Sequence, residues 1–459
     1  MTYPKVDYLV VGAGAMGMAF TDVLVTESDA TVALVDRHHQ PGGHWNVAYP
    51  FVRLHQPSSF YGVNSRPLGE DRIDTSGLNR GLYELASKSE ICAYYDNVMR
   101  DFISSGRVQY FPLCEYQNNG QITSLVSGAN HHITAHKTVD ASYMNVRVPA
   151  MGAPSYHVAQ GVRCVAPNAL AELDGEWDNY VVIGAGKTGM DACLFLLENG
   201  ADPANICWIK PRDSWLWDRA RAQSENLFEE SIRPFALGQV TAAAESDSVE
   251  DLFDRASAAG LLLRIDDEVR PTMFRCATVT LGEIAQLKRI ENVVRMGRVR
   301  GIEPGRVTLD GGTFDSGPAT LYIDCTADGL ATRPPQAVFD GDRITLQSVR
   351  TCQQVFSAAF IAHMEVTEPD EARKNRLCTP VPHPDTDMDY LRTLLADLAN
   401  GAAWAQDDAI MTWLKAARLD GWSHHGSSAE SDARFMARLE KQGATAAEKL
   451  MAYLTTSPG

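Results

Sequence analysis

The chain has 459 residues and a formal net charge of −17, with 45% hydrophobic and 22% charged residues. This composition is typical of a globular protein, and the length exceeds what one hydrophobic core usually organises, so we expect two or three domains. The negative charge argues against general binding to nucleic acids or anionic membranes. No apolar run reaches the roughly 18 residues of a membrane span, and the N-terminus enters a strand too early for a signal peptide.

The first element in chain order is a strand–turn–helix–strand unit. A hydrophobic strand over residues 8–11 leads into the glycine-rich turn Gly12-Ala13-Gly14-Ala15-Met16-Gly17, and the strand after the following helix ends at Asp36. Glycines in this pattern allow a tight turn and a close approach to a pyrophosphate, while the acid binds ribose hydroxyls. The unit therefore fits FAD or NAD, the alternative being a buried glycine-rich turn that binds no nucleotide.

The next segments are less regular. Residues 40–70 are rich in Gly, Pro, His and aromatic residues, and a loop of this length is usually functional. We expect a helix over residues 78–105, a strand over 108–112, and a hairpin formed by 122–125 and 132–139.

A second strand–turn–helix–strand unit begins at residue 180. Its turn is Gly184-Ala185-Gly186-Lys187-Thr188-Gly189, and its second strand ends in Lys210-Pro211-Arg212 rather than in an acid. A cationic tip suits the 2′-phosphate of NADPH, which a carboxylate would repel. The alternative for Lys210 and Arg212 is an ordinary solvated loop.

The remaining elements are predicted from periodicity and turn signals. We expect helices at 224–235 and 248–259, a hairpin around Asp310-Gly311-Gly312, and a buried strand at 321–323. Residues 344–366 are expected to be mostly helical. Residues 386–456 are expected to form helices interrupted at Gly401, at Gly421-Trp422 and at Gly443.

These elements predict an α/β protein with two Rossmann-like domains. An FAD domain would comprise residues 1–172 and be completed by residues 330–459, which also supply C-terminal helices. An NADPH domain over residues 173–329, with a helical insertion, would lie between the two parts. Both glycine turns would face one cleft, because ligands collect at the carboxyl ends of strands in such sheets.

The nine cysteines provide no local pair. None are spaced as Cys-x-x-Cys, which excludes a zinc ribbon and a local redox dithiol, and no other pattern predicts a metal site. An odd number of cysteines and the absence of a signal peptide favour a reducing cytoplasm.

The arrangement resembles the flavin-containing monooxygenases and the related Baeyer–Villiger monooxygenases over most of the first 330 residues. Besides both turns, Gly42-Gly43-His44-Trp45 is similar to their Gly-Gly-x-Trp motif, residues 48–58 to their flavin loop, and Gly189-Met190-Asp191 to the end of their second turn. The resemblance implies that NADPH reduces FAD. It further implies that a C4a-(hydro)peroxyflavin transfers one oxygen atom from molecular oxygen to a small organic substrate.

The chain departs from that family between residues 149 and 177. The Phe-x-Gly-x-x-x-His signature is missing there, and residues 155–162 contain His157 and Gly161 in another order. Other segments, such as 321–326, are similar to flavin-dependent halogenases. Two further hypotheses therefore stay open: an NAD(P)H-dependent flavin dehydrogenase, reductase or redox-neutral flavoenzyme, and a non-enzymatic nucleotide-sensing protein.

Four residues are candidates for the chemistry. Arg53 could hold NADPH or stabilise an oxygen anion, His55 could move a proton near neutral pH, and Gln56 lies beside them in the flavin loop. Trp217 follows the cationic tip and could line the cleft. The alternatives are a backbone hydrogen bond for His55 and simple core packing for Trp217.

The flavin N1–C2=O edge needs a helix N-terminus or a cation. The helix expected after Asp340-Gly341-Asp342 and Arg350 are the candidates, and a surface salt bridge is the alternative for Arg350. The sequence names neither the substrate nor whether a homodimer forms. The predicted cofactor-binding residues are Gly12, Gly14, Ala15, Met16, Gly17, Asp36, Arg37, Gly43, His44, Trp45, Gln56, Gly184, Gly186, Lys187, Thr188, Gly189, Lys210, Arg212 and Arg350.

Overall fold

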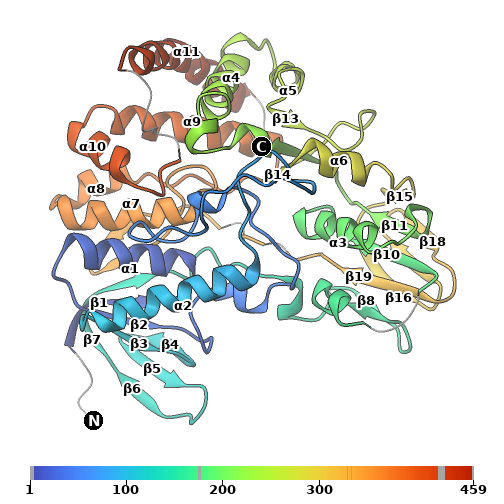
Figure 1. Ribbon diagram of the computed structural model, residues 1–459, viewed down its shortest axis with the longest axis horizontal. Helices are drawn as coiled ribbons and strands as arrows, with labels where there is room; N and C mark the ends of the chain where they lie inside the picture. Colours follow the sequence, from blue (N-terminus) through green and yellow to red (C-terminus); the bar gives the residue numbers. More distant parts are fainter. Residues whose placement is uncertain (1–4, 174–176, 328, 332, 422–428, 457–459) are drawn as a thin grey trace.

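The computed structural model describes residues 5–173, 177–327, 329–331, 333–421 and 429–456. Two sheets, one mostly and one wholly parallel, lie at opposite sides of the molecule in Figure 1, and a layer of helices from the insertion and the C-terminal region lies above them. This arrangement confirms the predicted α/β class with two Rossmann-like units and C-terminal helices.

The first sheet contains strands from both parts of the chain. Its order is β20-β21-β7-β1-β2-β3, and every neighbouring pair is parallel except β20 with β21. Its central strands are hydrophobic on both faces because helices cover one face and a small sheet covers the other. The bounds are β1 Lys5–Val11, β2 Val32–Val35, β3 Val108–Phe111, β7 Thr134–Asp140, β20 Phe339–Asp340 and β21 Arg343–Thr345.

Three helices cover the first sheet. Helix α1 (Ala15–Glu27) packs along α7 (Gln354–Thr367), and α2 (Lys88–Ser104) lies beside α1. The opposite face is covered by the antiparallel strands β4 (Cys114–Asn118), β5 (Gln121–Ser124) and β6 (Asn130–His132). The pairing Val11↔Val35 and Val11↔Asp140 brings three strand ends to one edge, where the first glycine turn begins.

The second sheet is parallel throughout, in the order β15-β11-β10-β19-β9. Helices α3 (Lys187–Glu198) and α6 (Leu281–Leu287) pack against one face. The other face packs against the sheet β18-β17-β16-β8. The bounds are β8 His157–Val158, β9 Cys164–Val165, β10 Asn179–Ile183, β11 Ile206–Ile209, β15 Val293–Val294, β16 Val299–Glu303, β17 Arg306–Leu309, β18 Gly312–Asp315 and β19 Thr320–Asp324.

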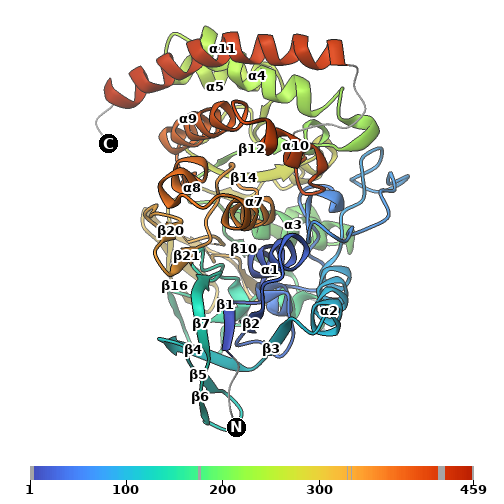
Figure 2. The same cartoon turned by 90° about the vertical axis from the view of Figure 1, so that its left-hand side faces the viewer.

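The insertion and the C-terminal helices share a third core. The strands are β12 (Ser214–Asp218), β13 (Leu262–Leu263) and β14 (Met273–Val279), and the helices are α4 (Ile232–Glu245) and α5 (Val249–Ala258). The long α11 (Ala429–Thr456) packs on α4 and on α9 (Asp387–Trp404), as Figure 2 shows at the top of the molecule. Helices α8 (Glu371–Leu377) and α10 (Asp408–Ala416) complete the layer.

Several predicted boundaries were wrong. The helix expected from residue 78 begins at Lys88, because Ser87 caps it and forms a reciprocal capping box with Glu90. Helix α4 begins at Ile232, so residues 224–231 are not part of it. Residues 343–345 form strand β21, and helix α7 starts only at Gln354. The helix expected directly after residues 340–342 is therefore absent.

The hairpin predicted for residues 122–125 and 132–139 and two of the predicted helix breaks were also wrong. Strand β5 does form a hairpin, but with β6, whereas residues 134–140 pair in parallel with β1. Helices α9 and α11 continue through Gly401 and Gly443. A Cβ on Gly443 would lie 3.8 Å from a methyl of Leu398, so this small residue lies at the packed helix contact. Trp422 lies outside the described residues.

Candidate functional site

A cavity of about 1280 Å³ lies between the two parallel sheets and the insertion. Both glycine turns line it, as do parts of the 40–70 loop, strands β12 and β14, and the segment before α7. The carboxyl ends of both sheets therefore open into one space, as the sequence predicted.

The first turn has the geometry that a dinucleotide cradle requires. Gly12 adopts a φ of 108°, and a Cβ on Gly17 would lie 1.9 Å from the carbonyl oxygen of Gly12, so both positions demand glycine. Gly14 is the N-cap of α1, and no side chain caps the helix. The first backbone N–H groups of α1 therefore remain available to an anion.

Asp36 lies at the tip of β2 and lines the cavity. Its carboxylate accepts hydrogen bonds from the backbone N–H of Ala13 at 2.6 Å and of His38 at 2.7 Å. Burial raises the pKa of Asp36, and these two hydrogen bonds act in the opposite direction. The carboxylate is thus fixed beside the first turn, with acceptor capacity left for ribose hydroxyls.

The Gly-Gly-His-Trp segment packs directly on the first turn. The N–H of Gly42 donates to the carbonyl of Ala13 at 2.8 Å, and a Cβ on Gly43 would lie 2.9 Å from the Cα of Gly14. His44 and Trp45 line the cavity, and burial lowers the pKa of His44 to about 4. The segment therefore extends the wall of the first cradle.

The second turn repeats this geometry. Gly184 has a φ of 126°, and a Cβ on Gly189 would lie 2.1 Å from the carbonyl oxygen of Gly184. Gly186 is the N-cap of α3 without a side-chain cap, and a Cβ there would meet no described atom within 4 Å. The space in front of α3 is thus open to a phosphate.

The two predicted cations at the tip of β11 differ. Lys210 is only 2% exposed, and its Nζ lies 2.5 Å from Asp213, so its charge is neutralised inside the protein. Arg212 lines the cavity and donates to both carboxylate oxygens of Asp385 at 2.9 Å. Arg298 also lines the cavity, and its side chain makes no hydrogen bond or ion pair within the described ranges.

The 40–70 loop joins the two domains. The hydroxyl of Tyr49 donates to Asp191 of α3 at 2.7 Å, and Phe51 stacks on Phe195 of α3 with ring centroids 4.1 Å apart. Burial, followed by the charge of Asp191, raises the pKa of Tyr49 well above its usual value. Arg53 is exposed and donates to the carbonyl of Leu85 at 3.0 Å.

His55, Gln56 and Trp217 all line the cavity. Burial, then the positive charges of Lys187 and Arg219, lowers the pKa of His55 to about 3. Its imidazole is therefore neutral at neutral pH. The Trp217 indole packs edge-on against Phe235, with the ring centroids 5.5 Å apart. Its buried N–H has no hydrogen-bond partner among the described residues.

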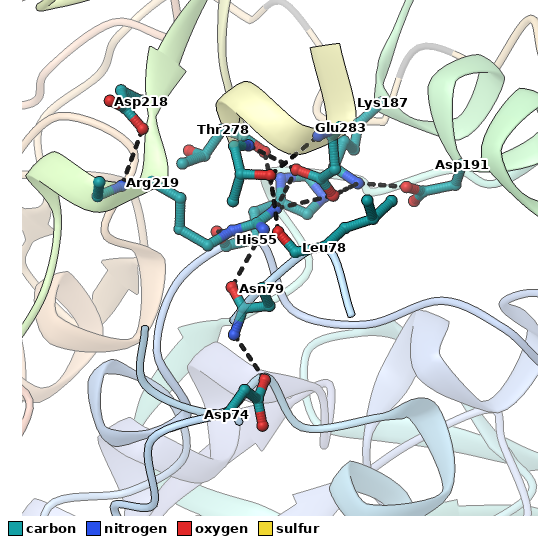
Figure 3. A network of polar contacts seen from close by, with 12 residues as sticks. His55, Asp74, Leu78, Asn79, Lys187, Asp191, Asp218, Arg219, Thr278 and Glu283 are labelled. Atoms are coloured by element: carbon teal, nitrogen blue, oxygen red, sulfur yellow. Dashed lines mark hydrogen bonds and ion pairs between the residues drawn. The ribbon is translucent and has the colours of Figure 1, made fainter. Parts of the chain in front are cut away.

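A buried polar network lies behind His55 (Figure 3). Arg219 is 1% exposed and donates to the carbonyl of His55 at 2.8 Å, and its Nη2 lies 3.0 Å from Glu283. Nζ of Lys187 lies 4.0 Å from Oε1 of Glu283 and forms a closer ion pair with the carboxylate of Asp191. The network thus connects the 40–70 loop, the second turn and the insertion.

The cavity brings together most of the predicted site residues. Five do not line it: Gly17 and Gly189 pack inside their turns, Lys210 is buried, Arg53 is turned outward, and Arg350 pairs with Asp420 and lies over the Phe356 ring. Those that do line it are Gly12, Gly14, Ala15, Met16, Asp36, Arg37, Gly43, His44, Trp45, His55, Gln56, Gly184, Gly186, Lys187, Thr188, Arg212 and Trp217.

The sequence reasoning missed several cavity residues. Cys276 and Cys352 line the cavity and form a disulfide, although they are 76 residues apart. His383 and Arg298 line it as well. Scanning for local cysteine spacing could not find this pair, and no local motif marks the other two.

Among the described residues, no helix combines the length and the apolar character needed to cross a membrane. No group of three or more His, Cys, Asp or Glu side chains in that part of the chain is placed to hold a metal ion.

Comparison with known proteins agrees with this geometry. The family described as "NAD(P)-binding Rossmann-like domain" matches residues 10–49, which contain the first turn and Asp36. A solved structure of OTEMO with FAD bound has a TM-score of 0.50 at 14% identity, covering 98% of this chain and 99% of its own. A cyclohexanone monooxygenase with bound ε-caprolactone has a TM-score of 0.50 at 14% identity, and the match covers 82% of this chain and 92% of that enzyme. The chain therefore shares its overall fold with these two proteins.

The sequence relatives are mycobacterial. The chain belongs to the same family as "Uncharacterized protein Rv2000" of Mycobacterium tuberculosis, to which it is 54% identical over 418 residues, covering 91% of this chain and 78% of the relative. It is 26% identical over 220 residues to "Putative FAD-containing monooxygenase MymA" of the same species, covering 46% of this chain and 43% of the relative.

Proposed function

We propose that the protein is an FAD- and NADPH-dependent monooxygenase that acts on a small organic substrate. The observation that carries this proposal is one cavity with two dinucleotide cradles of unlike ribose-end chemistry. The first cradle has the carboxylate Asp36, whereas the second has Arg298 and also Arg212, which is paired with Asp385. A carboxylate suits ribose hydroxyls and arginines suit a 2′-phosphate, which supports FAD at the first turn and NADPH at the second.

The glycine geometry fits two pyrophosphates. Gly14 and Gly186 lie at helix N-termini that no side chain caps. A Cβ on Gly186 would meet no described atom within 4 Å, so the space in front of it is open. Bound FAD would supply two-electron chemistry and the activation of oxygen. The protein's part is to orient both cofactors across one cavity and to exclude competing reactions.

The substrate would lie against the insertion. Trp217, Ile232, Phe235 and Met273 give this wall of the cavity an apolar surface, and the unpaired indole N–H of Trp217 is available to a substrate acceptor. An apolar wall with a few polar groups is typical of a site for a small organic molecule. The name of the relative MymA supports oxygen transfer as the reaction.

The proposal is tested with purified protein supplied with FAD. Under anaerobic conditions, NADPH should bleach the bound flavin. After oxygen is admitted, a panel of cyclic ketones and thioethers should include compounds that gain one atom from isotopically labelled oxygen gas, with one NADPH consumed per product. Protein that takes up no FAD, or FAD that NADPH does not reduce, would refute the proposal.

A flavin reductase without oxygen transfer is the second candidate. It is favoured by the missing Phe-x-Gly-x-x-x-His signature, in place of which His157 lies on β8 at the cavity. This candidate predicts that NADPH reduces the flavin but that oxygen is converted to hydrogen peroxide with every compound of the panel. A nucleotide sensor predicts FAD binding without turnover. A cytoplasmic location and a homodimer also remain predictions.

A further inference from the structure

We propose that Cys276 and Cys352 form a second two-electron redox centre, which accepts electrons from the flavin in the shared cavity. The inference rests on the proposed function, because it requires FAD at the first turn and NADPH at the second. It adds an internal electron acceptor that neither the sequence motifs nor the relatives' names contain.

The position of the pair carries the inference. Cys276 lies on β14 of the insertion, and Cys352 lies two residues before α7, which packs along α1 of the first glycine turn. Both line the cofactor cavity, and their Cα atoms are 6.7 Å apart. The disulfide therefore faces the same space as the two nucleotide cradles.

The two sulfurs have different surroundings. Cys276 is buried, whereas Cys352 is half-buried and lies at the N-terminal end of the 14-residue helix α7. No side chain caps α7, and the positive end of its helix dipole favours a thiolate nearby. Cys352 is thus the sulfur better suited to carry negative charge after the bond is broken.

The imidazole of His383 is placed to accept a hydrogen bond from a Cys352 thiol. Nδ1 of His383 lies 3.9 Å from Sγ of Cys352, and His383 lines the cavity. Burial, followed by the positive charge of Arg275, lowers the pKa of His383 to about 4. The imidazole is neutral at neutral pH, so it can accept a hydrogen bond from the Cys352 thiol when that thiol forms.

The electron balance is complete. Reduced flavin gives up two electrons and two protons and becomes oxidised flavin, while the Sγ–Sγ bond breaks and the two sulfurs become thiols. NADPH and one proton then reduce the flavin again. A fully reduced protein consequently stores four electrons per chain, two in the flavin and two in the dithiol.

A purely structural role for the bond explains less. Cys276 and Cys352 lie in or against the third hydrophobic core, which is already closed by packing between the insertion and the C-terminal helices. In the predicted cytoplasmic location, disulfides are usually catalytic or redox-sensing rather than structural. A pair that lines the cofactor cavity, beside an imidazole and a helix N-terminus, fits this class.

Anaerobic titration of the FAD-loaded protein with dithionite tests the inference. We expect four electrons per FAD before excess reductant appears, and a rise in thiols, counted after rapid acid quenching and unfolding, from the seven free cysteines of the oxidised chain to nine. Cys352→Ser and Cys276→Ser should each take up two electrons. Cys92→Ser, a half-buried free cysteine, is the matched control and should still take up four.

The outcomes separate this inference from the proposed function. Two electrons per FAD with an unchanged thiol count in the wild-type protein would overturn the redox centre, and this result needs no variant to fold. Nine thiols in protein purified in air would overturn the pair itself. If dithionite delivers four electrons but NADPH bleaches no flavin, the proposed function fails while the redox centre stands. A chain that binds no FAD overturns both.

Discussion

Nη2 of Arg219 lies 3.0 Å from Oε2 of Glu283 in the interior of the protein, where Arg219 is only 1% exposed. Glu283 belongs to the capping box at the start of α6, since the N–H of Thr280 donates to its carboxylate at 2.6 Å. Arg219 follows β12 and donates to the carbonyl of His55 in the 40–70 loop. The pair thus fixes the insertion against both dinucleotide units.

We therefore expect Arg219→Met to lower the free energy of unfolding by about 3–5 kcal/mol, because it leaves the Glu283 carboxylate buried with less compensation. Urea unfolding followed by fluorescence measures this. Arg100→Met, which removes an exposed ion pair with Asp96, is the matched control and should change stability by less than about 1 kcal/mol. Equal effects of both substitutions would contradict the assigned role.

The glycines of the second turn should separate nucleotide binding from folding. Gly186→Ala places a methyl in open space, so we expect normal thermal stability but a KM for NADPH raised about tenfold, since the methyl occupies the phosphate approach. Gly189→Ala should instead destabilise the protein by about 1–3 kcal/mol, because its Cβ would lie 2.1 Å from the carbonyl of Gly184. Gly152→Ala, at an extended and uncrowded position, is the control. Unchanged NADPH kinetics in Gly186→Ala would argue against a phosphate at α3.

Arg298 should determine part of the preference for NADPH over NADH. Its side chain lines the cavity and makes no hydrogen bond or ion pair within the described ranges, so we expect Arg298→Ala to raise the KM for NADPH about tenfold and to leave that for NADH unchanged. Steady-state kinetics with both nucleotides measures the change. Arg306→Ala, which removes an exposed charge of the neighbouring β17, should affect neither. A parallel change for both nucleotides would place the 2′-phosphate elsewhere.

Asp397 should make stability depend on pH. Burial raises the pKa of Asp397 to about 7, although the N–H of Thr351 donates to it at 2.6 Å and Arg350 lies near. The folded pKa exceeds the unfolded value of about 3.9, so this carboxyl stabilises the fold fully below about pH 4, and that contribution is lost as the pH rises through about 7.

In Asp397→Asn, a neutral amide replaces the protonated acid at every pH. We expect the unfolding free energy of the wild type to fall relative to that of Asp397→Asn by on the order of 3 kcal/mol between pH 4 and pH 8. Urea midpoints across that range measure the difference, and Asp96→Asn, on the surface, is the control. Parallel pH profiles of the wild type and Asp397→Asn would refute the raised pKa.

Local motifs and tertiary contacts contributed differently to the site. Both glycine turns, Asp36 and the Gly43-His44-Trp45 segment could be read from the sequence, because a strand, a tight turn and a helix N-terminus are specified by consecutive residues. The helix boundaries near residues 78 and 344 and the continuity of α11 at Gly443 could not be predicted in this way. They depend on capping by Ser87, on the parallel pairing of β21 with β7 and on the packing of α11 against α9.

By itself, the sequence determined that two dinucleotide cradles exist and that their ribose ends differ, because these features depend on neighbours along the chain. Only the tertiary structure decided which charges remain available in the cavity. Lys210 is neutralised by Asp213, Arg350 by Asp420, and His55 is kept neutral by burial beside Lys187 and Arg219. It alone brought Cys276 to Cys352 across 76 residues, because burial and the pairing of distant side chains are properties of the packed fold.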